Sequence, residues 1–288
     1  MPEKLPTLSA ATLLRTLFKR PARSAGAGPI ATRYLLEQIG ADEVARYRRA
    51  LGFAGTRIPL TYYYLLAQRA HLATMLGAAF PFRLVGAIHV DNALRAGMQP
   101  VAGRPLELAT EVRVGTPAAN GAVHAVLDTR ATQDGELVFA CSSTYLVVRG
   151  KRSGDGPRAS ARAAPALAPV AGWRLSATSG RRYAALSGDW NPIHLWPWSA
   201  RPMGLKAPII HGMHTLGRAC AELERAGGRP VAALGGRFRA PIELGGEAAL
   251  AASLAEGRFT VASGGRVAVE GEFAFDASQP MQEAYARS

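Results

Sequence analysis

The sequence predicts an α+β protein in which one arrangement of elements occurs twice. A long helix is expected over Thr61–Leu76, where Leu65, Leu66, Leu72 and Leu76 recur at helical spacing. Short runs typical of β-strands follow it, and the same order of helix and strands returns later in the chain. Strands that follow one another directly usually pair antiparallel, so each half should combine one helix with one antiparallel sheet.

In the first half, Thr61 is suited to cap the helix and Gly77 to end it. The strand candidates after it alternate or cluster β-branched and aromatic residues. They cover Leu84–Val90, Leu106–Val114, Ala122–Thr132 and Leu137–Val148.

In the second half, a helix should begin near Gly212 and stop at Gly227 and Gly228, with Met213, Leu216, Cys220 and Leu223 on one face. Gly264 and Gly265 suit a hairpin turn between the last two strands. The strands are expected over Val231–Phe238, Glu247–Glu256, Arg258–Ser263 and Arg266–Phe275.

A stretch rich in Gly, Pro, Ala, Ser and Arg separates the halves, which is the composition of a linker. The basic segment before the first half is expected to be a disordered or loosely docked arm. The predicted division is therefore an arm over 1–28, a first domain over 29–150, a linker over 151–169 and a second domain over 170–288.

The composition narrows the class of protein. With 48% apolar and 19% charged residues in 288, the chain should fold, and it holds no apolar run long enough for a membrane-spanning helix. The formal charge of +13 attracts anions, but the basic residues do not alternate with aromatic ones, so we expect no nucleic-acid binding. Membrane contact through the arm is the less favoured reading. Cys141 and Cys220 lie far apart in the sequence and form no Cys-x-x-Cys motif. This favours a reducing compartment, and we expect the cytoplasm.

Asp189 and His194 are the first candidates for chemistry. The segment from Ser187 to His194 reads SGDWNPIH, in which Asn191 and Pro192 predict a tight turn. A carboxylate and an imidazole brought together by a turn differ enough in pKa to share a water. One can take a proton from the water while the other delivers a proton to the substrate.

Gly212 follows at the predicted start of the second helix, within PIIHGM. The first N–H groups of a helix have no acceptor within it and lie at the positive end of its dipole. They could stabilise negative charge on a carbonyl oxygen. His211 and His214 lack further ligands at metal spacing, so a structural role is expected for them and no metal site is predicted.

Together, Ser187–His194 and Ile210–Met213 resemble the hydratase motif of the MaoC-like, (R)-specific enoyl-CoA hydratase family. The resemblance covers about residues 173–275 and implies a double hotdog, in which each of two long helices is wrapped by an antiparallel sheet. The first half lacks the motif and would be a degenerate hotdog. The implied activity interconverts trans-2-enoyl and (R)-3-hydroxyacyl thioesters.

The resemblance also implies roles for individual residues. Asp189 and His194 would be the catalytic pair, the Gly212 N–H the oxyanion donor, and Asn191 would shape the loop. Cys220 stands where some members place a Ser that supports the Asp. We further expect Lys206, Arg237 and Arg239 to bind the group that carries the acyl chain. They would contact either the phosphates of CoA or the acidic face of an acyl carrier protein.

No cofactor is expected, since the thioester itself acidifies the α-proton. The expected partners are an acyl-CoA or acyl-carrier-protein thioester and a second copy of the chain in a homodimer. Two alternatives stay open: a non-catalytic subunit that binds acyl thioesters, and a thioesterase of the same fold.

Overall fold

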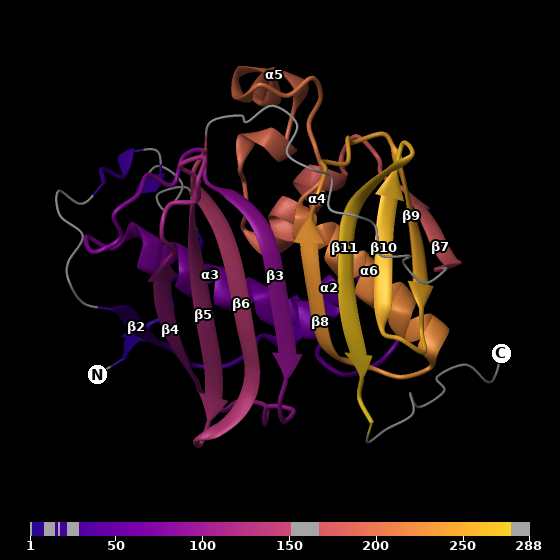
Figure 1. Cartoon of the computed structure of the whole chain (residues 1–288). Helices are drawn as coiled ribbons and strands as arrows, with labels where there is room; N and C mark the ends of the chain where they lie inside the picture. Colours follow the sequence, from indigo (N-terminus) through magenta and orange to yellow (C-terminus); the bar gives the residue numbers. More distant parts are fainter. Residues whose placement is uncertain (1, 9–14, 17, 22–28, 151–166, 278–288) are drawn as a thin grey trace.

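Strands from both halves of the chain form one continuous sheet in the computed structural model, which describes residues 2–8, 15–16, 18–21, 29–150 and 167–277 (Figure 1). Within these residues the sheet has eleven strands in the order β1-β2-β4-β5-β6-β3-β8-β11-β10-β9-β7. Each pairing is antiparallel except that of β1 with β2. The predicted antiparallel sheets are therefore confirmed, and they join edge to edge.

The first half contributes a long helix and one side of the sheet. Helix α3 spans Tyr63–Leu76 after the 3-10 turn η1 over Leu60–Tyr62, and helix α2 spans Ala41–Leu51. Helix α3 is apolar around most of its circumference, which suits a helix covered on several sides. The strands are β2 (Ile30–Leu36), β3 (Ile88–Ala96), β4 (Leu106–Val114), β5 (Val123–Gln133) and β6 (Glu136–Val148).

The second half repeats this plan around helix α6, Gly212–Gly227. Short helical elements come before α6: α4 (Ser179–Ser187), η2 (Pro192–His194), α5 (Pro197–Ala200) and η3 (Arg201–Met203). The strands are β7 (Ala168–Arg174), β8 (Val231–Phe238), β9 (Glu247–Ser253), β10 (Arg258–Ser263) and β11 (Arg266–Phe275).

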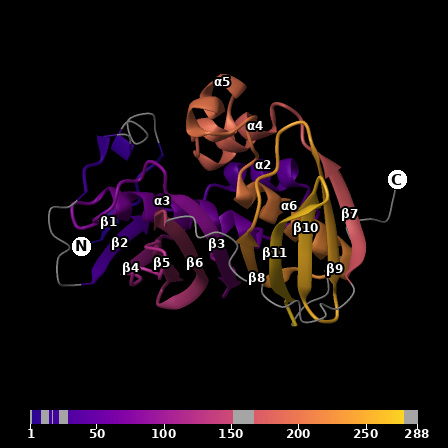
Figure 2. The same ribbon diagram turned by 45° about the horizontal axis from the view of Figure 1, so that its top comes forward.

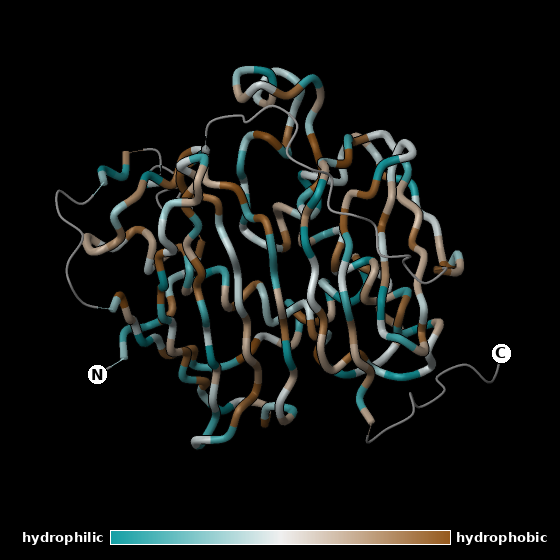
Figure 3. The backbone as a smooth tube through the Cα atoms, in the orientation of Figure 1, coloured by the Kyte–Doolittle hydropathy of each residue, from teal (hydrophilic) through white to brown (hydrophobic). Residues whose placement is uncertain are grey.

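Alternation along the strands sets which face of the sheet the helices cover. On β4, Leu106, Leu108, Thr110 and Val112 are buried, while the residues between them are exposed. Hydropathy alternates accordingly along the strands (Figure 3). Helices α2, α3 and α6 lie on one face of the sheet, and the other face has no helix over it in the described chain (Figure 2).

The two halves meet at β3 and β8, which pair antiparallel with Leu94 opposite Leu234. The largest apolar cluster crosses this junction and includes Leu66 and Leu94 from the first half with Leu216 and Leu234 from the second. Burying one such leucine contributes about 1.5–3 kcal/mol, so the shared core stabilises the junction as well as each half.

The start of the predicted arm is packed against the first half. Strand β1 (Glu3–Lys4) pairs parallel with β2, and Leu5 is only 2% exposed. The Arg69 guanidinium of α3 donates to the carbonyl oxygens of Leu5 and Pro6, at 3.1 and 2.8 Å. Leu8 then lies against Gly188, which precedes Asp189. Residues 2–8 are thus part of the fold, while most of 9–28 lies outside the described residues.

Some boundaries differ from the predicted ones. The strand expected over Leu84–Val90 is found at Ile88–Ala96, because the buried polar Asn92 interrupts the apolar pattern. Its amide donates to the Ser143 hydroxyl at 2.9 Å, which makes its burial acceptable. The 3-10 turn at Leu60 puts Tyr62 at the helix cap, so Thr61 is not the cap.

Strands β2 and β7 and helix α2 were not predicted. Strand β7 begins at Ala168, inside the expected linker, most of which lies outside the described residues. The predicted division into arm, first domain, linker and second domain stays a prediction. Among the described residues, no helix has both the length and the apolar character needed to span a bilayer.

Candidate active site

The loop that carries Asp189 begins where helix α4 ends. Gly188 has a φ of +73°, the left-handed conformation that glycine favours, and its N–H donates to the Ala184 carbonyl oxygen. The Ser187 hydroxyl donates to the Tyr183 carbonyl oxygen and accepts a 3.2 Å hydrogen bond from the Asp189 N–H. These bonds end the helix and fix the backbone at Asp189.

Asn191 holds the next part of the loop. The Asn191 N–H donates to Asp189 Oδ1 at 3.1 Å, and Asn191 Oδ1 accepts from the Ile193 N–H at 3.3 Å. That second bond caps η2, which has Pro192 at its start, where a missing N–H costs nothing. The predicted turn is confirmed, and it carries the chain from Asp189 to His194.

His194 is nearly buried, with 8% of its surface exposed. Its Nδ1–H donates to the Ile209 carbonyl oxygen at 2.9 Å, so Nε2 is left with a free lone pair when the ring is neutral. Burial lowers the pKa of His194, and the Asp189 carboxylate and the bond to Ile209 partly oppose this shift. His194 is therefore a hydrogen-bond acceptor at neutral pH.

Helix α4 also positions His194 through a close approach. A Cβ atom on Gly180 would lie 1.9 Å from the His194 carbonyl oxygen, so the helix and the loop can pack this tightly only with glycine. The neighbouring Arg181 donates to the Leu195 carbonyl oxygen at 2.9 Å. The backbone on both sides of the His194–Leu195 peptide is therefore held by α4.

His211, for which only a structural role was expected, lies directly on the pair. Its ring stacks on that of His194 with centroids 3.6 Å apart, and its Nε2–H donates to the Asp189 carbonyl oxygen at 2.9 Å. Burial, followed by the neighbouring His194, lowers its pKa. The sequence signal that could have revealed it is its position immediately before Gly212 in the second motif.

Gly212 begins helix α6 directly after His211. As the first residue of the helix, it has an N–H without an acceptor inside the helix. A Cβ here would come within 2.7 Å of the Phe238 ring, so glycine lets β8 lie close to the start of the helix. The structure thus brings Asp189, His194 and the beginning of α6 to one place.

Three side chains at the site lie close enough to one another to act as ligands of one metal ion. Asp189, His194 and His211 each offer a side-chain nitrogen or oxygen within 4.8 Å of the other two. Each histidine has one nitrogen bound to a backbone carbonyl oxygen, which leaves one nitrogen apiece. The donor set could accept a metal, and its absence stays a prediction to be tested.

The other predicted residues lie on α6, on the segment before it, and on β8 and just beyond it. Cys220 is fully buried in α6, eight residues and so roughly 12 Å beyond Gly212. Lys206 is exposed on the segment before α6.

Arg237 and Arg239 are exposed on β8 and just beyond it, where they pair with Asp91 and Glu270. Alternation puts Arg237 on the opposite face of the sheet from Phe238.

Three side chains of the first half, Tyr64, His89 and Tyr145, act electrostatically with Asp189. Burial lowers the pKa of His89 to about 4, which the Asp91 backbone and the Asp189 carboxylate partly oppose. Burial mainly, and Asp189 to a smaller extent, raises the pKa of both tyrosines. From the sequence alone, only packing or structural roles are expected of Tyr64 and His89, because their effect on Asp189 arises only when the two halves pack together.

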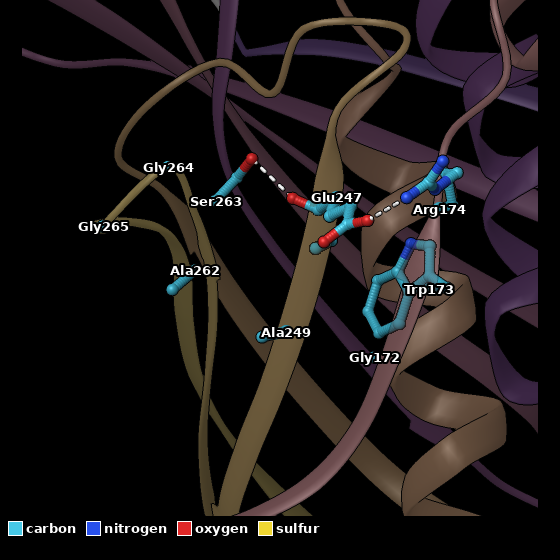
Figure 4. A pocket seen from close by; sticks show the side chains of 10 residues that line it. Gly172, Trp173, Arg174, Glu247, Ala249, Ala262, Ser263, Gly264 and Gly265 are labelled. Carbon is cyan, nitrogen blue, oxygen red and sulfur yellow. Dashed lines mark hydrogen bonds and ion pairs between the residues drawn. The ribbon is translucent and has the colours of Figure 1, made fainter.

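An open hollow of about 470 Å³ lies elsewhere, on β7, β9 and the β10–β11 hairpin (Figure 4). Its rim carries the Arg174–Glu247 ion pair, and the Ser263 hydroxyl donates to the Glu247 carbonyl oxygen at 2.6 Å. Small residues such as Gly172 and Ala249 also line it. None of the residues that line it belongs to the motif.

Comparison with known proteins identifies the family. Residues 166–268 match the family described as MaoC like domain. The 3-hydroxyacyl-thioester dehydratase X of Mycobacterium tuberculosis is 30% identical over 198 residues, which are 66% of this chain and 69% of that protein.

Solved structures agree with the fold. The crystal structure of HtdX from Mycobacterium tuberculosis matches with a TM-score of 0.66 and 25% identity, over 84% of this chain and 98% of that one. A MaoC-like dehydratase from Phytophthora capsici matches with a TM-score of 0.68 and 19% identity, over 87% and 96% of the two chains. These structures confirm the double hotdog. The chain belongs to the MaoC-like dehydratase family.

Proposed function

We propose that this enzyme interconverts trans-2-enoyl and (R)-3-hydroxyacyl thioesters by adding and removing water. The observation that carries the proposal is the convergence of Asp189 and His194 beside the first turn of α6. A carboxylate and a neutral imidazole nitrogen both accept hydrogen bonds, and together they can hold one water molecule by its two hydrogens.

The proposed reaction follows from this arrangement. In hydration, the water oxygen bonds to C3 while His194 Nε2 takes one of the water protons. The electrons of the C2=C3 double bond move toward the thioester carbonyl oxygen, and the imidazolium then returns its proton to C2. The Asp189 carboxylate accepts a hydrogen bond from the other water hydrogen, which stays on the oxygen as the C3 hydroxyl group. Asp189 also stabilises the imidazolium, so His194 both takes and returns the transferred proton. Dehydration is the reverse sequence.

Gly212 is proposed to stabilise the negative charge that builds on the thioester oxygen. Its N–H is free of acceptors within α6 and lies at the positive end of the helix dipole. A backbone donor needs no reorganisation as charge develops, which is the property that makes such donors effective. His211 is proposed as a positioning residue, because it holds both the Asp189 backbone and the plane of the His194 ring.

The carrier of the acyl group is proposed to be CoA or an acyl carrier protein. Lys206 is proposed to bind its phosphates or acidic face at the rim of the active site. Arg237 and Arg239 can meet its phosphates only if the carrier reaches the other face of the sheet, and each must then leave its acidic partner. A supporting role of Cys220 toward Asp189 stays a prediction. We also propose a homodimer in the cytoplasm.

A direct test is the loss of the ultraviolet band of the conjugated enoyl thioester, followed with crotonyl-CoA and longer enoyl-CoA substrates. Turnover that yields a 3-hydroxyacyl thioester, with no free thiol released, would support the proposal and exclude a thioesterase. No turnover on any enoyl thioester, with CoA or with a carrier protein, would leave only the acyl-thioester binding subunit.

The pH dependence should report His194. Because the residue must be neutral to accept a proton, kcat/KM for hydration should fall as the pH drops through its pKa, which burial places below 6.5. We therefore expect a flat profile near neutrality and an acidic limb below pH 6.5. Asn in place of Asp189 removes a charge that raises this pKa, so the limb of the residual activity should move to lower pH. A limb centred above pH 7 in the parent would contradict this assignment.

Removal of metal should leave the enzyme active. Since the proposed proton transfers use only Asp189 and His194, dialysis against EDTA is expected to change kcat by less than about twofold. Metal content measured on the same dialysed sample provides the control. An activity that disappears on dialysis and returns with one added divalent cation would assign a metal to Asp189, His194 and His211.

A further inference from the structure

Three aromatic rings of the first half form one stack. The His89 ring lies 4.7 Å from that of Tyr145 with 17° between the planes, and 5.6 Å from that of Tyr64 with 11°. They come from three different elements: β3, β6 and α3. The Tyr64 hydroxyl lies 3.5 Å from His89 Nδ1, at the long limit of a hydrogen bond.

A β-bulge lies next to His89 on β3. In the pairing of β3 with β6, His89 lies opposite Tyr145 but Asp91 lies opposite Thr144, so Val90 is the extra residue. Such bulges redirect side chains and are frequent beside active sites. The His89 ring contacts rings on both neighbours of β3, Tyr145 on β6 and Phe238 on β8.

Phe238 connects the stack to Gly212, the proposed oxyanion donor. The Phe238 ring lies 5.2 Å from that of His89, and the same Phe238 ring packs against Gly212 at the start of α6. The Asp189 carboxylate acts electrostatically on each of the three stacked groups. The stack therefore borders the place where the substrate reacts.

The polar atoms of the stack are buried and incompletely bonded. Tyr64 and Tyr145 are 5% and 9% exposed, and their hydroxyls interact with each other. His89 Nε2 is buried and makes no hydrogen bond of normal geometry within the described residues. Buried polar atoms are nearly always satisfied, so a missing partner indicates a bound water or a polar ligand group.

The polar character continues into the first half, beneath α3. His71 Nε2 and the Thr129 hydroxyl are 2.9 Å apart, and Thr129 and Thr110 share a bond of 2.7 Å. Asn92 Oδ1 and His71 Nδ1 are buried without partners in the described chain. A purely apolar interior would not contain these groups, and an alkyl chain laid over the stack would cover polar atoms without replacing their bonds.

We propose that Tyr64, His89 and Tyr145 form a polar subsite that binds a neutral hydroxyl or carbonyl group on the acyl part of the substrate. The inference rests on the proposed function and names its substrate class: acyl thioesters that carry an oxygen function beyond C3. Two phenol groups supply donors, and the imidazole can donate or accept. None of the three residues carries a positive charge at neutral pH, so a carboxylate is not the expected group.

The test compares two substrates of equal length, trans-2-hexenoyl-CoA and 6-hydroxy-trans-2-hexenoyl-CoA. The parent enzyme should have a kcat/KM about tenfold higher for the hydroxylated substrate, the value of roughly one hydrogen bond. In the double variant Tyr64→Phe/Tyr145→Phe this preference should fall to about one. Each single variant should lose part of it, which keeps the test valid if the double variant does not fold.

Tyr63→Phe is the matched control. Tyr63 neighbours Tyr64 on α3 and is equally buried, but it stacks on Phe139 and its hydroxyl has no partner among the described residues. Its variant should keep the parent preference. A parent without preference, or variants that lose both substrates equally, would overturn the polar subsite. Both results leave the proposed hydration intact, which fails only if the parent hydrates no enoyl thioester.

Discussion

Replacing Asp189 by Asn or His194 by Ala is expected to lower kcat by roughly 10³-fold, because each change removes a group that holds or moves the proton of the water. The double variant should be little worse than either single one, since residues that act as a unit lose their effect together. The hydration rate on crotonyl-CoA at saturating substrate measures both effects.

His124→Ala is a suitable control, because this histidine is exposed on β5, outside the site. Its kcat should equal that of the parent. Near-normal turnover in either single variant, with the fold intact by circular dichroism, would remove Asp189 and His194 as the reacting pair. Additive losses would show that the two residues act independently.

Gly180→Ala should lower both activity and stability, although this residue touches no substrate. Alanine normally favours a helix over glycine by about 1 kcal/mol. Here its Cβ would meet the His194 carbonyl oxygen at 1.9 Å and must displace either α4 or the loop. We expect a loss of about 1–3 kcal/mol in the free energy of unfolding, as for overpacked cores, and a fall in kcat of about tenfold or more.

Gly172→Ala is the matched change on β7, where the nearest atom to the new Cβ is the Ala248 carbonyl oxygen at an ordinary 3.7 Å. Its Tm and kcat should stay close to those of the parent. The opposite outcome for Gly180→Ala, a higher Tm with parent activity, would mean that helix propensity outweighs the contact and that α4 does not position His194.

The fold was predictable where local pattern and tertiary packing agree. Strands β8, β10 and β11 begin and end as predicted, because alternation marks their length and glycines or turns mark their ends. Strand β2 has no clean alternation and was missed. Helix α2 does carry a signal, since Val44, Tyr47 and Leu51 recur at helical spacing between two glycines.

The residues of the site also fall into those that local sequence predicts and those that only the tertiary fold reveals. Asp189, Asn191, His194 and Gly212 lie in two short motifs, so local turn and helix-start chemistry was enough to propose them. His211 needed the tertiary fold, because its contact with His194 depends on how α6 meets the loop. The stack around His89 brings together three elements of the first half beside a bulge, and its contact with Phe238 needs the packing of the two halves. The local sequence specifies neither.

The junction between β3 and β8 has a consequence for how the protein can change over time. In an oligomer of identical subunits, one substitution appears in every subunit. A change that improves one surface therefore also alters the equivalent surface of every other subunit. Here the two hotdogs belong to one chain, and their sheets join where β3 pairs with β8, with Leu94 opposite Leu234. A change in one hotdog leaves the other untouched. The first can therefore diverge freely in the groups it presents to the substrate, while the second conserves the chemistry.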